Sequence, residues 1–510
     1  MEQFFQQLSN VNDVINDFVW VKIGLVLLIG TGILMTCCTK FFQISHIGHW
    51  WKETIGSVFK KDSSATKKTD KKSISQFQAL CTALAATIGT GNIAGVAAAI
   101  VIGGPGAVFW MWIAAFFGMM TNFSENVLGI YYRRKNKAGE WSGGAMYYLQ
   151  DGLGNKKHCK GLATVLAVLF AVFAILASFG IGNMGQVNKI TLNLQSAFFR
   201  NVNLGELFGI PVVNILIGLV IMILAGLIII GGLQRIAAVA ERVIPFMAIA
   251  YIVGALIVFV IHIGTVGEMF LAIFRFAFGI KAVAGGVAGV AISKVITQGC
   301  KRGVFSNEAG LGSSVMVHSA SNVKEPVKQG MWGIFEVFFD TFVVCTITAV
   351  VVLSSGYIDL ETGLPIGEVN DATLVSQAFG NVFGMAGEMF IALAMLLFAF
   401  TTVLGWSQYG SKAIEYLWGE KAVKVYKVIF VLMIMSGAVM TSSLAWDISD
   451  TFNGLMMVPN LIGVLTLFPL VAKITQNYVN RRIKGKEEEP MLSYDENLQK
   501  EAKAALEQEG

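Results

Sequence analysis

Glycines and small polar side chains interrupt an apolar stretch at residues 87–98, which read Thr-Ile-Gly-Thr-Gly-Asn-Ile-Ala-Gly-Val-Ala-Ala. The surrounding run 78–102 would form a helix about 37 Å long, enough to cross a bilayer. Backbone that unwinds at that depth needs a polar cavity or a ligand for its amides and carbonyls. A discontinuous helix of this kind typically forms a solute and ion site, and close helix packing through glycine is the alternative interpretation.

The two ends of this predicted break favour ligands of opposite charge. Amide groups where the helix resumes, from about Asn92 onward, attract an anion such as a carboxylate, and Thr90 or Asn92 can cap that end. The carbonyls of Ala85 and Ile88 end the preceding half-helix at its negative pole, which suits a cation. The break therefore predicts an anion site beside a cation site.

Two neighbouring threonines, Thr401 and Thr402, lie inside the apolar run 383–410. Counted from the predicted inner ends of their helices, they lie at about the depth of Ile88. Hydroxyl and carbonyl oxygens are the ligands that hard cations prefer, so these residues and Ala85 predict a Na⁺ site. In the alternative interpretation each hydroxyl bonds the carbonyl four residues earlier in its own helix.

A third group of candidates lies at residues 178–186, where an aromatic ring, small residues and amides follow one another. Phe179 is predicted to wall a small-solute pocket, with Gly182 making room and Gln186 supplying a polar group above it. Packing at a polar helix end is the alternative interpretation.

Carboxylates inside a membrane span are treated as functional by default because burying them is costly. Asp340 and Glu336 lie one turn apart in the run 332–354. They are predicted to form an inner gate with Arg302, Arg235 or Arg133, or to carry protons. A plain ion pair at the inner face is the alternative.

The composition requires many membrane spans to position these residues. The chain has 510 residues, of which 55% are hydrophobic and 14% charged, with a mean hydropathy of +0.64. This composition indicates a polytopic all-α membrane protein. The six cysteines show no Cys-x-x-Cys spacing, so neither a disulfide framework nor a metal site is expected. Eleven transmembrane helices are predicted, at about 17–38, 77–103, 105–131, 161–187, 209–232, 243–263, 266–299, 332–354, 383–410, 426–446 and 454–474.

The charge distribution predicts the orientation. The alternate connections 40–76, 131–160, 233–242, 300–330, 411–428 and 473–510 contain 32 Lys and Arg residues. The connections on the other side contain two, Lys189 and Arg200. Because basic loops stay in the cytoplasm, the N-terminus is predicted outside and the C-terminus inside a bacterial-type cell membrane.

Ten of the spans divide into two halves of five. The predicted organisation is an N-terminal helix and basic loop at 1–76, repeats at 77–263 and 264–476, and a charged cytoplasmic tail at 477–510. The second half also opens with a glycine-rich run, Phe278 to Gly289, which contains Lys281. An odd number of helices gives the halves opposite topology, and paired broken helices in inverted halves are typical of secondary transporters. Lys281 is predicted to stay near the cavity.

Several motifs resemble the alanine/glycine:sodium symporter family of amino-acid carriers. They are Thr-Gly-Asn-Ile-Ala-Gly-Val at 90–96, Gly-Gly-Pro-Gly-Ala-Val-Phe-Trp at 103–110, Gly-Gly-Ala-Met-Tyr-Tyr at 143–148, Arg-Gly-Val-Phe-Ser-Asn-Glu-Ala-Gly-Leu-Gly-Ser at 302–313 and Glu-Val-Phe-Phe-Asp-Thr at 336–341. The resemblance implies the LeuT-type five-plus-five inverted repeat with one extra helix in front. It also implies symport of a small neutral amino acid with Na⁺, or in some members H⁺.

The same resemblance assigns residues to roles. It implies that Thr90, Gly91 and Asn92 hold the substrate carboxylate, and that Phe179 and Gly182 shape the pocket. The segment 276–284, with Phe276 and Ile280, would meet the amino group or side chain. Ala85 and Ile88 carbonyls with Thr401 and Thr402 hydroxyls would hold Na⁺.

The function expected from these observations is Na⁺-driven import of alanine or glycine, with serine and glutamine as further candidates. A proton-coupled symporter or exchanger that uses Asp340 is the alternative. A channel lacks its carbonyl-ring filter here, and a membrane enzyme lacks a nucleophile–base set or metal ligands. We expect no organic cofactor and no nucleic-acid partner.

Overall fold

The computed structural model describes residues 2–60, 65–67, 72–279, 288–367, 371–440 and 444–508. These residues form a helical protein with two short antiparallel ribbons, β1 (Arg134–Lys135) with β2 (Trp141–Ser142) and β3 (Glu206–Leu207) with β4 (Ile210–Pro211). The predicted site residues Ile280 and Lys281 lie outside the described part of the chain.

The helices of the N-terminal part and of the first predicted repeat precede Ile261. They are α1 (Glu2–Asp17), η1 (Phe18–Gly24), α2 (Leu25–Cys38), α6 (Gln76–Thr87), η2 (Gly91–Gly95), α7 (Val96–Gly103), α8 (Gly106–Tyr131), α10 (Lys160–Phe179), η4 (Gly180–Met184), α11 (Gly185–Phe198), α12 (Val212–Ile229) and α13 (Gly232–Ile261). Helix α6 begins with a capping box, in which Ser75 and Gln78 each bond the other's backbone amide.

The helices after Ile261 follow a similar plan. They are α14 (Val266–Ala277), α15 (Ala288–Asn307), α16 (Val315–His318), α17 (Pro326–Val337), η7 (Phe338–Cys345), α18 (Thr346–Ser354), α20 (Met385–Trp418), α21 (Glu420–Val439), α22 (Leu444–Tyr478) and η8 (Val479–Ile483). Shorter helices connect them: α3 (Phe42–Ser45), α4 (Ile47–Glu53), α5 (Ile55–Val58), α9 (Ala145–Tyr147), η3 (Tyr148–Leu153), η5 (Ile263–Thr265), α19 (Asp371–Phe383) and α23 (Glu496–Glu507).

The number of spans differs from the prediction. Within the described residues, nine helices are long and apolar enough to cross a membrane, and α6 with the helix that follows it makes a tenth. The predicted eleventh span, 266–299, corresponds to α14 and α15, between which part of the chain is not described. The count of eleven therefore remains a prediction.

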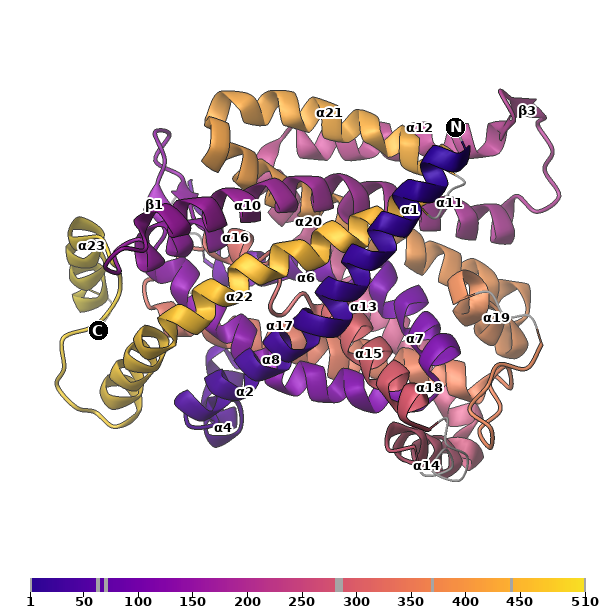
Figure 1. Ribbon diagram of the computed structural model, residues 1–510, viewed down its shortest axis with the longest axis horizontal. Helices are drawn as coiled ribbons and strands as arrows, with labels where there is room; N and C mark the ends of the chain where they lie inside the picture. The colour runs from indigo at the N-terminus through magenta and orange to yellow at the C-terminus, as the bar shows by residue number, and fades with distance from the viewer. Residues whose placement is uncertain are drawn as a thin grey trace.

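The extra N-terminal helix lies along the outside of the bundle. Figure 1 shows α1 and α2 crossing beside α22, with α10, α12 and α21 on one side and α14 and α15 on the other. The Trp20 indole donates to the Asp450 carbonyl (3.2 Å), which joins the N-terminal helix to the start of α22. The two termini lie toward opposite ends of the long axis.

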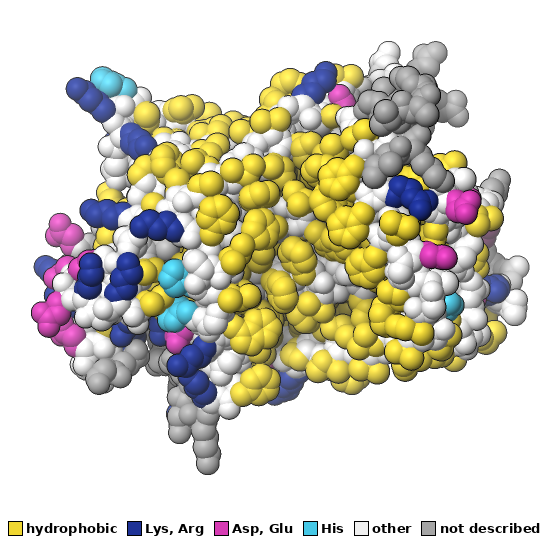
Figure 2. All heavy atoms as spheres, turned by 90° about the horizontal axis from the view of Figure 1, so that it is seen from below, with side chains coloured by type: hydrophobic (Ala, Val, Ile, Leu, Met, Phe, Trp, Pro, Cys, Tyr) yellow, Lys and Arg dark blue, Asp and Glu magenta, His cyan; other side chains and the backbone are white. Residues whose placement is uncertain are grey.

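The surface has the distribution expected of a protein embedded in lipid. Figure 2 shows an apolar band across the middle of one face, with Lys, Arg and His side chains gathered at one end. Exposed leucine, valine and isoleucine side chains are common on α12 and α13, for example Val220 at 57% and Val260 at 64% exposure. These side chains would face acyl chains, because no polar partner covers them.

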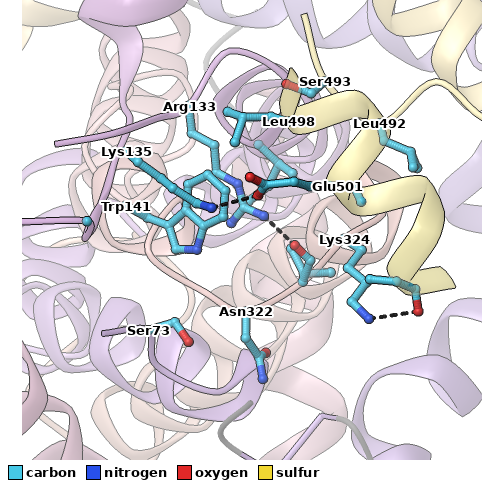
Figure 3. A pocket seen from close by; sticks show the side chains of 15 residues that line it. Ser73, Arg133, Lys135, Trp141, Asn322, Lys324, Leu492, Ser493, Leu498 and Glu501 are labelled. Atoms are coloured by element: carbon cyan, nitrogen blue, oxygen red, sulfur yellow. Dashed lines mark hydrogen bonds and ion pairs between the residues drawn. The ribbon is translucent and has the colours of Figure 1, made fainter. Parts of the chain in front are cut away.

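The charged end of the chain folds back onto the bundle. Helix α23 is held by an ion pair from Lys135 to Glu501 (2.6 Å) and by the Lys324 ammonium, which donates to the Ala505 carbonyl (3.1 Å). A pocket of about 190 Å³ lies beneath it, and Figure 3 shows Arg133 against Trp141 on its wall. The predicted charged tail thus contains an anchored helix.

Candidate functional site

The first predicted break is present and bends the helix by 55°. The Ile88 amide makes the last helical bond, to the Leu84 carbonyl (2.8 Å). The Gly89 amide then donates to Asn92 Oδ1 (2.9 Å), whereas in a continuous helix it would donate to the carbonyl of Ala85. Side-chain acceptors therefore replace the helix ladder here, and the Ala85 carbonyl loses its helical partner.

A second side chain supports the break from a different helix. The Thr90 amide donates to Gln186 Oε1 (3.2 Å) of α11. Gln186 is itself fixed, because its Nε2 donates to the Ile181 carbonyl (3.0 Å). The structure thus brings the predicted residues Thr90, Asn92 and Gln186 together. The Thr90 hydroxyl is buried and has no hydrogen-bond partner, so it does not cap the helix.

Glycine is required at the break because neighbouring helices approach its backbone closely. A Cβ on Gly91 would lie 3.1 Å from the Phe305 ring and 3.3 Å from Ser306 Cα of α15. A Cβ on Gly89 would clash with the Thr402 hydroxyl of α20. The break therefore lies between α15 and α20, with backbone exposed to both.

A second break faces the first, at residues that the sequence analysis did not identify as a break, whereas most of the predicted glycine-rich run from Phe278 to Gly289 lies outside the described residues. Helix α15 ends at Asn307, and a buried irregular segment leads to α16 through Glu308 (φ 56°), Gly310 (φ 94°) and Gly312 (φ 73°). Because α15 contacts the first break through Phe305 and Ser306, residues 305–314 are the segment opposite it.

Of the predicted segment 276–284, the structure describes only residues 276–279. Helix α14 does end at Ala277, but Phe276 packs where Gly106 starts α8 and where Gly363 turns in the loop 355–367. These neighbours are the start of α8 and the loop 355–367, and the role of Phe276 as a substrate contact stays a prediction.

Asp340 connects the two breaks. This carboxylate of η7 is fully buried and accepts from Asn92 Nδ2 (2.6 Å) at the first break and Ser306 Oγ (2.8 Å) at the second. The Thr341 hydroxyl donates to it as well (3.0 Å). Asp340 is thus bonded by neutral donors, and it forms no ion pair in the part of the chain that the structure describes.

Among the described residues, neither carboxylate pairs with the arginines named for the predicted inner gate, and the gating role itself stays a prediction. Glu336 accepts from His318 Nε2 (2.9 Å) and Asn122 Nδ2 (3.2 Å), not from an arginine. Arg133 donates to backbone carbonyls, including that of Ser321 (2.6 Å). The remaining two cations are elsewhere: Arg235 donates to the Leu227 carbonyl (2.7 Å), and Arg302 lies one turn before Ser306 on α15.

The predicted cation ligands converge on one carbonyl that the sequence analysis missed. Both threonine hydroxyls donate to the Phe398 carbonyl, from Thr401 at 2.9 Å and from Thr402 at 3.0 Å. Thr402 Oγ1 is also 3.5 Å from the carbonyl of Ile88 across the helix interface. Each hydroxyl therefore does bond a carbonyl of its own helix, as the alternative interpretation stated. These bonds hold both hydroxyl oxygens close to the Phe398 carbonyl oxygen. The repeated bonding to the carbonyl three or four residues earlier is the signal that could have identified Phe398.

Phe179 packs against α21, and Gly182 packs against α20. The Phe179 ring lies 5.3 Å from that of Tyr426 in an edge-on arrangement. A Cβ on Gly182 would overlap the Trp406 side chain of α20. Gly182 thus lets Trp406 approach, and Phe179 is directed toward α21, so the roles of both residues in a solute pocket stay predictions.

Comparison with known proteins identifies the family of the chain. Residues 5–492 match the sodium:alanine symporter family. The sodium/alanine symporter AgcS of Methanococcus maripaludis is 42% identical over 471 residues, covering 92% of this chain and 97% of that protein. The chain belongs to the sodium:alanine symporter family.

Two further relatives and a solved structure agree. The amino-acid carrier protein AlsT and the probable sodium/glutamine symporter GlnT, both of Bacillus subtilis, are 35% and 36% identical, covering 95% and 94% of this chain and 94% and 93% of their own lengths. The crystal structure of MhsT in complex with L-phenylalanine superposes with a TM-score of 0.53 at 13% identity, covering 80% of this chain and 99% of that one. The fold is thus of the LeuT type.

Family membership fixes the general activity. The symporter is a multi-pass membrane protein that couples amino-acid transport to Na⁺, and it is not an enzyme. In such a transporter, two facing helix breaks held by Asn92, Ser306 and Asp340 are where backbone groups become free to meet cargo.

Proposed function

We propose that the symporter imports a small neutral amino acid, alanine or glycine, together with Na⁺ by alternating access. The observation that carries this proposal is the redirected amide of Gly89, which leaves the Ala85 carbonyl without its helical donor, next to an Ile88 carbonyl that lies 3.5 Å from the Thr402 hydroxyl of α20. Na⁺ would bind between the carbonyls of Ala85, Ile88 and Phe398 and the hydroxyls of Thr401 and Thr402. Five neutral oxygens from two helices suit a hard monovalent cation.

The substrate carboxylate is proposed to meet the other side of the same break. Thr90, Gly91 and Asn92 would bind it through their backbone amides and the free Thr90 hydroxyl, which is buried without a partner. A bare amide or hydroxyl at this depth is costly unless a ligand satisfies it. The close approach of Phe305 to Gly91 favours a small substrate.

Shared residues supply a reason for coupling. Asn92 fixes the break on the cation side by accepting from Gly89, and it donates to Asp340 on the other side. A cation that stabilises this arrangement also orders the substrate site, so each ligand favours the state that binds the other. We place the N-terminus outside the cell and the C-terminus in the cytoplasm, with the repeats at 77–263 and 264–476 inverted relative to each other.

Uptake into proteoliposomes tests the proposal. Labelled alanine should accumulate under an inward Na⁺ gradient and not under an equal K⁺ gradient, and unlabelled glycine should compete more strongly than glutamine. Glutamine as the stronger competitor would give the substrate range of a glutamine carrier instead. Absence of accumulation with any of these amino acids, in protein that elutes as a monodisperse peak, would refute the substrate class.

Proton coupling is the second candidate, and one observation favours it. Asp340 is a fully buried carboxylate whose described partners are all neutral, which is a suitable environment for binding a proton. Alanine uptake driven by an imposed pH gradient without Na⁺ would establish it, and uptake that follows only Na⁺ would exclude it.

A further inference from the structure

A small cavity with two unpaired cations lies next to the first break. It has a volume of about 50 Å³ and is lined by Thr90, Ala94, Ala98, Lys189, Arg302 and Phe305. Lys189 belongs to α11 and Arg302 to α15, so both project from helices and not from the connections in which the sequence analysis placed them.

The charges lining this cavity lack counter-ions. Neither Lys189 nor Arg302 forms an ion pair or a side-chain hydrogen bond in the described parts of the chain, and Arg302 Nε is buried without a partner. The neighbouring Lys301 is different, because it pairs with Asp450 at 2.6 Å. Asp447 lies within electrostatic range of Arg302 but does not line the cavity.

A third polar group points to a ligand. Thr90 also lines the cavity and is 2% exposed, and its buried hydroxyl has no hydrogen-bond partner among the described residues. The cavity is thus lined by residues that carry one buried hydroxyl and two cationic groups, and by no carboxylate. These groups can all donate hydrogen bonds, and no lining carboxylate accepts them. The Arg302 guanidinium lies 5.9 Å from the centre of the Phe305 ring, and neither cation has a counter-ion in an ion pair among the described residues. Cations within a transmembrane segment are costly, so this arrangement favours an anion as the ligand.

The position of the cavity relative to the break indicates at which stage of entry a ligand would reach the cavity. Ala94 and Ala98 belong to the half-helix that continues from the break toward Gly103. The charge distribution predicts this end to be extracellular. Thr90 lies at the boundary, since its amide donates to Gln186 at the break and the residue also lines the cavity.

We infer that Lys189 and Arg302, with the Thr90 hydroxyl, form an outer anion site that binds the carboxylate of the entering amino acid. From there the carboxylate passes Thr90 to the amides of the break. The inference rests on the proposed function and adds a selection step to it. The site attracts the carboxylate of a zwitterion and repels a substrate with a cationic side chain.

Alanine uptake by variants of these two cations tests the inference. The double variant Lys189→Gln, Arg302→Gln should raise the KM for alanine about ten-fold, the value expected for losing a charge-assisted contact. The Na⁺ concentration for half-maximal rate and the rate at saturating alanine should stay within about two-fold, since the proposed cation ligands are untouched. The single variant Arg302→Lys, which keeps the positive charge, should retain most of the wild-type affinity for alanine. Arg200→Gln is the matched control, because that exposed arginine pairs with Glu388 at 3.3 Å, outside the cavity.

A competition assay separates an anion site from a structural role. Inhibition of alanine uptake by 2,4-diaminobutyrate, a small cationic amino acid, should be stronger in the double variant than in the wild type. An unchanged KM in the double variant, with wild-type transport intact, would overturn the inference alone. Lack of alanine transport by the wild type would overturn the proposed function and this inference with it.

A third experiment tests whether the ligand is an inorganic anion instead of the substrate carboxylate. Replacing chloride with gluconate should leave wild-type uptake unchanged if the site serves the substrate carboxylate. A chloride requirement that Arg302→Gln abolishes would assign the site to chloride and overturn the inference.

Discussion

Replacing Thr402 with valine removes one proposed Na⁺ ligand and leaves the shape of the side chain nearly unchanged. The hydroxyl lies 3.0 Å from the Phe398 carbonyl and 3.5 Å from that of Ile88, so it is the group that joins the two helices at the proposed cation site. An interaction with a charged partner is worth about 1.5–3 kcal/mol, and about 1.4 kcal/mol changes an affinity ten-fold. Thr402→Val should therefore raise the Na⁺ concentration for half-maximal uptake about 10- to 100-fold.

The assay is alanine uptake into proteoliposomes over a series of Na⁺ concentrations. The KM for alanine measured at saturating Na⁺ should change little, because Thr402 is not among the proposed substrate contacts. Thr475→Val is the matched control. That threonine is buried in α22 and bonds only the Val471 carbonyl four residues earlier (2.7 Å). An unchanged Na⁺ dependence in Thr402→Val, or an equal change in the control, would refute the proposed cation site.

Three other substitutions or conditions have definite expected outcomes. Gly182→Ala places a Cβ inside the Trp406 side chain, and overpacking of this kind costs about 1–3 kcal/mol, so the unfolding temperature in detergent should fall; no change would mean that Trp406 moves freely. Asp340→Asn presents an amide to Asn92 and cannot accept all three bonds, so uptake should fall at least about ten-fold with Na⁺ dependence retained, whereas intact uptake without pH dependence would make Asp340 a proton carrier. Burial lowers the pKa of His49, which contacts the Tyr478 hydroxyl, so the unfolded chain binds its proton first and stability should fall as pH drops below about 6.5. His49→Gln should flatten that dependence in thermal unfolding curves measured from pH 8 to 5, and an unchanged curve would contradict the assignment.

The first break could be predicted because its signals are local. Glycines flanked by Thr90 and Asn92 in an apolar run are unfavourable in a plain helix, and Asn92 then supplies the acceptor that the broken backbone needs. The bonds from Gln186 and Asp340 to this region could not be derived in the same way. They connect residues from separate helices, and hydropathy reports burial but not which helices meet.

The break that follows Asn307 was missed because its composition is that of a loop. Residues 301–314 contain Lys301, Arg302 and Glu308, which suggested a connection outside the membrane. In the fold, Lys301 pairs with Asp450, and Glu308 accepts from Ser313 Oγ at 2.5 Å. Polar groups that are satisfied by one another can be buried, and single-residue hydropathy does not register that compensation.

The amide of Gly89 has a consequence for the empty transporter. In a continuous helix this amide would share the Ala85 carbonyl with a Na⁺ ion bound at the proposed site, so helix winding would weaken that oxygen as a ligand. Asn92 Oδ1 accepts from the Gly89 amide instead, which leaves the Ala85 carbonyl for the ion. When the ion leaves, rewinding by one residue becomes the rival state, and it would release Asn92 from Gly89. Na⁺ binding would then act on the free-energy difference between the wound and the unwound form of this turn.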